Sequence, residues 1–183
     1  MPRESKRHKI LEAAALIVHN QGTDALTLDA VAKQAEVSKG GLLYHFSSKE
    51  SLVKGLVEHM DTIYRENVEG YANADQEQTG KWTRALVNTM YKAGIENKEI
   101  SAGMLAAQGI NPQLLKPLQE TYSNWQEQIQ QDEGIDEVQA TILRLAVDGL
   151  WLSEIFGLGT LDDDLRKKVL ERLLQHTHNH SSE

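Results

Sequence analysis

Apolar residues recur at helical spacing along almost the whole chain. Near the start they occupy Ile10, Ala13, Ala14 and Ile17, which is the i, i+3, i+4, i+7 pattern of an amphipathic helix over residues 4–20. The pattern predicts further helices at about 28–35, 39–45, 49–71, 81–94, 98–108, 112–131, 136–157 and 162–176. Because β-branched runs and hairpin turn pairs are scarce, we expect an all-α fold.

Helix start signals mark several of these boundaries. Thr27 and Ser38 are good N-cap residues before the two short helices. Residues 47–50 read Ser-Ser-Lys-Glu, the Ser-x-x-Glu spacing of a capping box for a long helix. Asn111-Pro112 is an N-cap followed by proline at the first helical position, and Pro117 is expected to kink or restart that helix.

Composition narrows the class of protein. Hydrophobic residues make up 40% of the 183 and charged residues 25%, with a mean hydropathy of -0.47, as in soluble globular domains. The chain has no cysteine, which excludes disulfides, thiolate metal sites and cysteine nucleophiles. With no membrane-length apolar run and no secretory leader, a cytoplasmic protein is expected. No motif assembles a catalytic site, so we expect neither enzyme activity nor a cofactor. His176, His178 and His180 alternate in the tail without a fixed scaffold, so we expect no metal site there.

The charge is unevenly distributed. The net charge of -8 alone disfavours nucleic-acid binding. Residues 1–54, however, hold eight Lys or Arg against six Asp or Glu, whereas residues 55–183 hold eleven against twenty-one. A locally basic face can therefore dock on DNA although the rest of the chain is acidic.

The two short helices, joined by the tight turn Ala35-Glu36-Val37, are predicted to form a helix-turn-helix. Such a unit places the N-terminal end of its second helix in the major groove of DNA. Lys39 begins that helix and is a donor able to reach guanine O6 or N7. Gly40 and Gly41 cost helix stability, which indicates that another molecule approaches the backbone closely. Phosphate donors are expected at helix starts and on the second helix, at Thr27, Ser38, Ser48, Tyr44, His45 and Lys49.

Each of these assignments has a simpler alternative. Lys39 can be an ordinary solvated lysine, and His45 a packed or capping histidine. Basic residues at and just before the start of the first helix either extend the DNA footprint or remain solvated; these are Arg3, Lys6, Arg7 and Lys9. Phe46 shares helical spacing with Leu42 and is expected in the core rather than at DNA.

The residues of this region also form an extended motif. It reads Ile10-Leu-x-Ala-Ala, then Gly22, then Thr27-Leu-x-x-Val31-Ala32-x-x-Ala35-x-Val37-Ser38-Lys39-Gly40-x-Leu42-x-Tyr44-His45-Phe46-x-x-Lys49-x-x-Leu52. Over about residues 4–56 it resembles the DNA-binding domain of TetR-family transcriptional regulators. The resemblance places DNA contacts on Thr27, Ser38, Lys39, Gly40, Tyr44, His45 and Lys49. Leu43 stands where many members have a phosphate-contacting tyrosine, so either Tyr44 serves instead or that contact is lost.

The resemblance implies a two-part architecture. A three-helix DNA-binding head would occupy residues 3–60 and a helical ligand-binding and dimerisation body residues 61–183, with a disordered tail at 177–183. Family members are homodimers that bind palindromic operators, usually as repressors, and a small molecule in the body releases the DNA. The implied partners are operator DNA, an effector and a second copy of the chain, without a membrane. The alternative is a helical protein-interaction module that has lost DNA binding.

Two sets of residues in the second part suggest further sites. Residues able to line an apolar pocket for a drug-sized ligand, or to belong to an ordinary core, are Met60, Trp82, Met90, Tyr91, Met104, Tyr122, Trp125 and Trp151. Asp148 lies in a strongly apolar helix and needs a partner, which is either Arg144 four residues earlier or a cationic ligand.

Two helical stripes near the C-terminus suggest a dimer surface. On the last two predicted helices the stripes consist of Ile142, Leu145, Gly149, Leu152 and Phe156, and of Leu165, Val169 and Leu173. Two such helices from each of two chains would form a four-helix interface, with Gly149 allowing close approach. The alternative is that both stripes belong to the core of a single chain.

Overall fold

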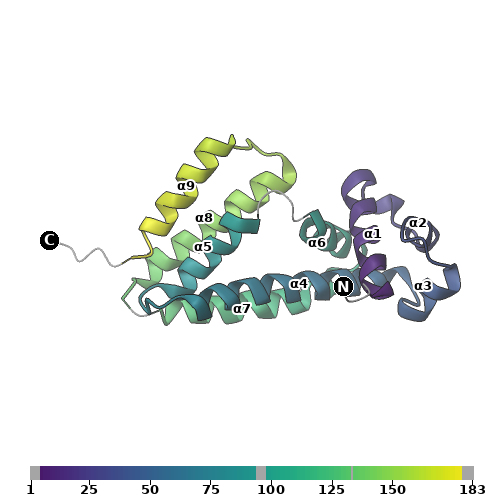
Figure 1. Cartoon of the computed structure of the whole chain (residues 1–183), viewed down its shortest axis with the longest axis horizontal. Helices are drawn as coiled ribbons and strands as arrows, with labels where there is room; N and C mark the ends of the chain where they lie inside the picture. Colours follow the sequence, from purple (N-terminus) through teal and green to yellow (C-terminus); the bar gives the residue numbers. More distant parts are fainter. Residues whose placement is uncertain (1–4, 94–97, 133, 179–183) are drawn as a thin grey trace. The chain divides into compact units, whose positions relative to one another are not determined.

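The computed structural model describes residues 5–93, 98–132 and 134–178, and these ranges contain nine α-helices and no strand (Figure 1). The helices are α1 (Lys6–Gln21), α2 (Leu28–Gln34), α3 (Lys39–His45), α4 (Lys49–Ala74), α5 (Lys81–Ala93), α6 (Lys98–Ile110), α7 (Lys116–Gln130), α8 (Glu137–Phe156) and α9 (Asp163–Gln175). The all-α prediction is therefore confirmed, with each predicted helix in place to within a few residues. The expected helix start at Glu4, Arg3 and tail residues 179–183 lie outside the described residues.

Backbone contacts divide the chain into two compact units. The first unit comprises residues 1–62 and 97–119, and the second comprises residues 63–96 and 120–183. Helix α6 thus belongs with the N-terminal helices, although it lies far from them in sequence. Helices α4 and α7 each contribute residues to both units. The division into a DNA-binding domain up to residue 60 and a ligand-binding domain from residue 61 stays a prediction.

Side-chain caps begin the helices where the sequence indicates. Thr27 Oγ1 accepts a hydrogen bond from the Ala30 N–H at 3.1 Å, and Ser38 Oγ accepts one from the Gly41 N–H at 3.0 Å. Asn111 caps a 3-10 turn at Pro112–Leu115, after which α7 starts at Lys116 with Pro117 in its first turn. Local hydrogen-bonding chemistry therefore fixes these boundaries.

The capping box of α4 is shifted by one residue from the predicted one. The Ser48 N–H donates to Ser51 Oγ at 2.9 Å, and the Ser51 N–H donates to Ser48 Oγ at 3.0 Å. Glu50, the expected partner of Ser47, instead accepts a hydrogen bond from Asn111 Nδ2 at 2.7 Å. A short serine side chain reaches back as well as a glutamate, which leaves Glu50 available for a contact distant in sequence.

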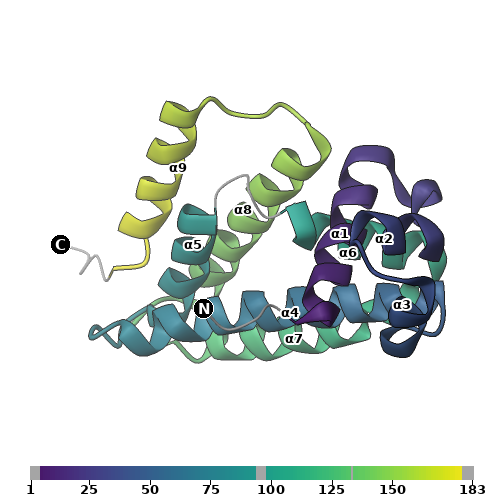
Figure 2. The ribbon, with the colours of Figure 1, turned by 45° about the vertical axis from the view of Figure 1, so that its right-hand side comes forward.

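Helix α1 is the centre of the first unit. Its predicted stripe is buried, and so are Leu11 and Val18, which lie outside that stripe. The reason is that α1 packs against α2 on one side and α6 on another, so more than one face is covered (Figure 2). On α6, Gly103 faces α4, and a Cβ added there would lie 3.5 Å from the Leu56 backbone, an ordinary van der Waals distance.

Phe46, at the end of α3, is 3% exposed, which confirms its assignment to the core. Its ring lies against Gly55 of α4. A Cβ added at Gly55 would stand 2.6 Å from the Phe46 ring, so the ring occupies the space that a larger residue would need. This contact joins the helix-turn-helix to α4 within the first unit.

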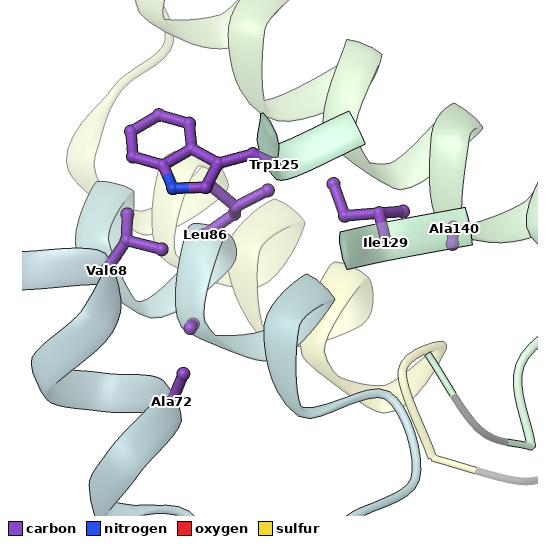
Figure 3. Packing of buried hydrophobic residues seen from close by; sticks show 7 residues of the cluster. Val68, Ala72, Leu86, Trp125, Ile129 and Ala140 are labelled. Atoms are coloured by element: carbon purple, nitrogen blue, oxygen red, sulfur yellow. The ribbon is translucent and has the colours of Figure 1, made fainter. Parts of the chain in front are cut away.

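The second unit has two apolar clusters. One joins α4, α5, α7 and α8 (Figure 3), and its buried members are Val68, Ala72, Ala85, Leu86, Trp125, Ile129 and Ala140. The other joins α5, α8 and α9 through Val87, Met90, Val147 and Leu170. Helix α5 contributes to both, which explains why it is buried on several sides. No helix in the described part of the chain is long and apolar enough to cross a membrane.

A buried arginine ties the C-terminal end of α9 to the segment between α4 and α5. The Arg84 side chain is 6% exposed, and its Nε donates to Asp75 Oδ2 at 2.7 Å. Its other nitrogens donate to the carbonyls of Glu77 at 2.7 Å, Thr79 at 2.6 Å and Thr177 at 3.4 Å. The charge is thus satisfied largely by backbone oxygens, as a buried guanidinium requires.

Glycine is required at position 80, beside this arginine. A Cβ added at Gly80 would stand 2.3 Å from the Thr177 carbonyl oxygen, and Gly80 has a φ of +66°. Both the space and the backbone conformation therefore favour glycine.

Candidate functional site

Helices α2 and α3 form the helix-turn-helix that the sequence predicts. The turn closes through a hydrogen bond from the Val37 N–H to the Ala32 carbonyl at 3.0 Å. Glu36 at its centre has a φ of 55°, in the left-handed region. Beneath the two helices, Val31 and Leu42 are fully buried, so the unit is held by its own apolar face. The opposite face of α3 is exposed to solvent.

The exposed side of α3 carries the residues predicted to read DNA. Lys39, Gly40, Leu43 and Tyr44 are all exposed, and the pairs 39/43 and 40/44 are each four residues apart on the helix. Tyr44 is 86% exposed, an unusual exposure for an aromatic ring, and its ring lies edge-on to that of His45 with 5.1 Å between the ring centroids. Leu43, in contrast, is 39% exposed. This face therefore presents an ammonium, a bare backbone and a phenol together.

Gly40 has no structural reason within the chain to be glycine. It is not at positive φ, and a Cβ added there would meet nothing within 4 Å. Glycine at a helix position costs up to about 1 kcal/mol relative to alanine. The absence of a side chain therefore points to close approach from outside. At Gly41 a Cβ would lie 3.1 Å from Ser38 Oγ, so this glycine also keeps the N-cap uncrowded.

The structure gives several predicted phosphate donors an intramolecular role. Lys49 is half-buried, and its Nζ donates to the Thr23 carbonyl at 3.2 Å. His45 is half-buried as well. Arg7 lies 3.8 Å from Glu58 and stacks over the Phe46 ring at 5.4 Å. The hydroxyls of Thr27 and Ser38 accept in their caps but keep their own hydrogens to donate.

Lys39 is ion-paired across the turn. Its Nζ lies 2.8 Å from Asp29 Oδ1 in the first turn of α2, and both side chains are mostly exposed. Sequence reasoning missed this contact, because nine residues, including the turn, lie between the two partners.

In the second unit, Asp148 has the partner that its apolar helix requires. Arg144 Nη1 donates to Asp148 Oδ2 at 2.6 Å, while the Tyr122 hydroxyl lies 3.5 Å from Oδ1. Arg144 Nε also donates to Gln126 Oε1 at 2.7 Å, which links α8 to α7. Burial raises the pKa of Asp148 although Arg144 and Tyr122 favour its charged form. The predicted Arg144 partner is thus confirmed.

Aromatic rings surround this polar group. Tyr64 and Tyr122 both contact Trp125, with ring centroids 5.0 and 5.4 Å apart. Burial raises the hydroxyl pKa of both tyrosines, and the nearby Asp148 charge adds to the effect. Tyr64 was not among the predicted residues, although it is four residues from both Met60 and Val68 on α4.

The predicted pocket residues fall into separate groups. Trp82, Tyr122 and Trp125 belong to the first apolar cluster of the second unit, whereas Met90, Tyr91 and Trp151 belong to the second. Met60 and Met104 lie in the other unit. The structure thus brings only Tyr122, Trp125 and Asp148 together around the polar group, and the assignment of the set to a pocket stays a prediction.

Helices α8 and α9 leave a large apolar face exposed. Ile142, Leu145, Leu152 and Phe156 on α8 are between 42% and 55% exposed, and Leu165 on α9 is 46% exposed. Gly149 has nothing within 4 Å of an added Cβ. Val169 and Leu173 are half-buried, and Leu173 packs against the second cluster. These side chains are the ones expected at a dimer surface, and the assignment of both stripes to that surface stays a prediction.

Two family models match the chain. The model described as bacterial regulatory proteins of the tetR family matches residues 10–56, and the tetracyclin repressor-like C-terminal domain matches residues 80–178. The second match alone covers more than half of the chain. The chain belongs to the TetR family of transcriptional regulators. A TetR-family regulator carries a helix-turn-helix DNA-binding domain and is not an enzyme, so both of these predictions are confirmed.

Curated relatives of this TetR-family chain are regulators as well. It is 24% identical over 135 residues to the uncharacterised HTH-type transcriptional regulator YvdT of Bacillus subtilis, covering 70% of this chain and 68% of YvdT. It is 30% identical over 110 residues to the HTH-type transcriptional regulator UidR of Escherichia coli, covering 52% of this chain and 55% of UidR. The repressor KstR2 of Rhodococcus jostii is 33% identical over 95 residues, covering 50% of this chain and 44% of KstR2.

Solved structures agree with the TetR fold. The fatty acid degradation regulator FadR of Bacillus halodurans superposes with a TM-score of 0.74 at 15% identity, covering 100% of this chain and 99% of FadR. The multidrug binding protein EbrR, solved with ethidium, gives a TM-score of 0.59 at 20% identity, covering 92% and 98%. These likenesses confirm an N-terminal helix-turn-helix head and a helical C-terminal body.

Proposed function

We propose that this TetR-family regulator is a homodimeric repressor that binds a palindromic operator in the cytoplasm and releases it when a small molecule binds its body. The observation that carries the DNA-binding part is the exposed face of α3. It combines a lysine at the helix start, a glycine with no internal reason to be one, and a tyrosine that is 86% exposed.

Each side chain on this face has a proposed role. Lys39 donates to the O6 and N7 acceptors of a guanine in the major groove. Gly40 lets the helix backbone approach the bases, and Tyr44 donates its hydroxyl to a phosphate in place of the residue replaced by Leu43. The hydroxyls of Thr27 and Ser38 lie at the starts of α2 and α3, where they donate to the phosphates flanking the groove. Lys49 and His45 join them once a phosphate competes with their internal contacts.

The exposed face of α8 and α9 supports the homodimer. A twofold interface uses the same patch on both chains, so a self-complementary apolar surface is sufficient. Two copies would bury Ile142, Leu145, Leu152 and Phe156 in a four-helix arrangement. Two α3 helices in one dimer would then enter successive major grooves about 34–36 Å apart, which explains why the operator is palindromic.

The polar group around Asp148 supports an effector site in the body. Aromatic rings with one charged pair recognise a drug-sized apolar or cationic molecule, because the rings offer area and the carboxylate offers charge. EbrR, of similar fold, was solved with ethidium, which is a molecule of that class. A bound cation would compete with Arg144 for Asp148. Helices α4 and α7 contain residues of both units, so they are the physical route to the head, provided that the effector binds the two head spacings unequally.

The proposal is tested first without knowing the operator. The purified chain is used to select sequences from a randomised duplex library, and fluorescence anisotropy then compares the selected duplex with unrelated DNA at two salt concentrations. A palindromic selected sequence, and affinity that falls with a slope of about -0.9 per phosphate contact, are expected. Selection of no sequence would refute the proposal and favour a protein-interaction role instead.

The effector part of the proposal is tested on the complex already formed between the chain and its selected duplex. Ethidium is titrated as the probe cation, in amounts checked against the DNA alone because it also binds duplexes. Release of operator from the wild-type chain but not from an Asp148→Ala variant is expected. Equal release from both would refute a role for Asp148 in effector binding.

A further inference from the structure

An ion pair connects the two helices of the helix-turn-helix. Asp29, the second residue of α2, holds the ammonium of Lys39, the first residue of α3, at 2.8 Å. The Lys39 side chain is 62% exposed and that of Asp29 is 72% exposed. The pair therefore lies on the surface, at the position from which Lys39 would reach a base.

The fold does not depend on this pair. Such an exposed pair adds little to stability, since water solvates both charges well and both side chains lose freedom by pairing. The helices it connects already have their own caps, Thr27 and Ser38, and their apolar face is buried. An acidic residue so close to the DNA-reading lysine also opposes binding to a polyanion. Asp29 also lies in the first turn of α2, where its negative charge favours the helix dipole, but that effect needs no lysine partner and leaves the pairing with Lys39 to be explained.

We propose that Asp29 is a positioning residue that sets the specificity of DNA binding. It holds the Lys39 ammonium and competes with backbone phosphates for it, so it weakens binding to arbitrary DNA more than binding to the operator. This inference rests on the proposed contact between Lys39 and a guanine, and it adds to that contact the means by which wrong sequences are rejected.

The number of N–H donors on the Lys39 ammonium explains why Asp29 weakens binding to arbitrary DNA more than binding to the operator. A lysine ammonium has three N–H donors. One donor keeps the bond to Asp29, and two remain for O6 and N7 of a guanine, so the specific complex retains the ion pair. On arbitrary DNA the base edge lacks this acceptor pair, and the remaining attraction comes from phosphates. Lys39 then has to leave Asp29, or a phosphate has to approach a carboxylate of like charge.

The same geometry gives Asp29 a second effect. A lysine side chain has four rotatable bonds, and it loses conformational freedom when its ammonium is fixed on a base. An ammonium already held at 2.8 Å has lost part of that freedom before DNA arrives. The carboxylate therefore favours the one orientation that base contact needs and disfavours the many that phosphate contact allows. Specificity obtained by penalising the wrong partner is a general device of recognition surfaces.

The deciding variant is Asp29→Asn, which keeps the shape of the side chain and removes its charge. Binding is measured by fluorescence anisotropy on a duplex of scrambled sequence and on the duplex selected by the wild-type chain, each over a series of salt concentrations. Affinity for the scrambled duplex is expected to rise about three- to tenfold at low salt, with a salt slope steeper by about 0.9. Affinity for the selected duplex is expected to stay the same or fall, so the specificity ratio decreases.

Two controls separate this role from simple charge removal. Glu69→Gln changes the net charge equally at an exposed position of α4 in the other unit, and it is expected to leave the specificity ratio unchanged. In a Lys39→Ala background, Asp29→Asn is expected to have no further effect on the ratio, because the carboxylate acts through the ammonium. Circular dichroism confirms that each variant is folded.

The outcomes are distinct. A specificity ratio that stays at the wild-type value in Asp29→Asn, or that falls equally in Glu69→Gln, refutes the role of Asp29 while leaving the regulator itself intact. An effect of Asp29→Asn that persists fully without Lys39 also refutes it. A wild-type chain that selects no sequence refutes the proposed function, and the inference with it.

Discussion

Replacing Leu145 with glutamate is expected to separate the proposed dimer. Leu145 lies in the middle of the exposed face of α8 and is 55% exposed in one chain. Burying a whole leucine side chain is worth about 1.5–3 kcal/mol, so covering its exposed half contributes about 1 kcal/mol per chain. Twofold symmetry doubles this to about 2 kcal/mol.

Glutamate adds a second penalty to that loss. Each interface half would bury a carboxylate without a partner, at a cost of at least about 1–2 kcal/mol per chain. The two effects together amount to about 4–6 kcal/mol. The dissociation constant of the dimer is therefore expected to rise about a thousandfold or more.

Sedimentation equilibrium over a wide range of protein concentrations measures this shift directly. Anisotropy on a full palindrome and on a single half-site gives the functional consequence, because a separated chain is expected to bind both duplexes equally weakly. The matched control is Leu105→Glu, which places the same charge on an exposed leucine of α6 that is 38% exposed. A Leu145→Glu chain that stays dimeric with the wild-type constant would show that α8 does not form the interface.

Three further predictions concern single residues. Lys39→Ala is expected to weaken binding to the selected duplex by about 1–3 kcal/mol in anisotropy, and unchanged affinity would remove Lys39 from the base contacts. Arg84→Met deprives Asp75 and several carbonyls of their donor and is expected to cost about 3–5 kcal/mol, or about 6–20 °C in Tm by calorimetry; a shift below about 3 °C would contradict it. Burial alone would raise the pKa of Asp75, but the hydrogen bonds from Arg84 and from the Glu77 N–H, together with the charges of Arg84 and His178, outweigh burial and hold the pKa below 3.8. Because the folded pKa is the lower one, the carboxylate stabilises the fold above about pH 4 and less as the pH falls further. Acid titration of Asp75→Asn by circular dichroism should therefore show a smaller loss of stability below pH 4 than the wild type, and parallel curves would contradict this.

The parts of the fold that depend on neighbouring residues were predictable from the sequence. Thr27 and Ser38 were identified as N-caps because a cap needs only a hydroxyl and an N–H three residues later. Pro117 was expected to restart a helix, and α7 begins one residue before it. One of these local predictions was wrong by a residue, since Ser51 rather than Glu50 completes the capping box of α4.

Contacts between residues distant in sequence were not predictable. Periodicity marked the stripe through Ile142 and Leu145 but cannot distinguish a face turned to solvent from one turned to another helix. Lys49 has the chemistry of a phosphate donor, and only the fold shows its ammonium on the Thr23 carbonyl. Nothing in the sequence distinguishes Arg84 from other charged residues of an amphipathic helix, because the carbonyls that accept its hydrogen bonds come from separate segments.

Because Gly80 lies against the Thr177 carbonyl, the residues that position 80 tolerates depend on where the C-terminus of the chain is truncated. A fusion tag joined after His178 leaves this contact intact, whereas a chain shortened to Gln175 loses the oxygen that fills the space beside Gly80. Asparagine tolerates a left-handed backbone, so Gly80→Asn should be accepted in the shortened chain and rejected in the full one. Designers of reporter fusions built on this regulator should therefore treat position 80 and the C-terminal cut as a single choice.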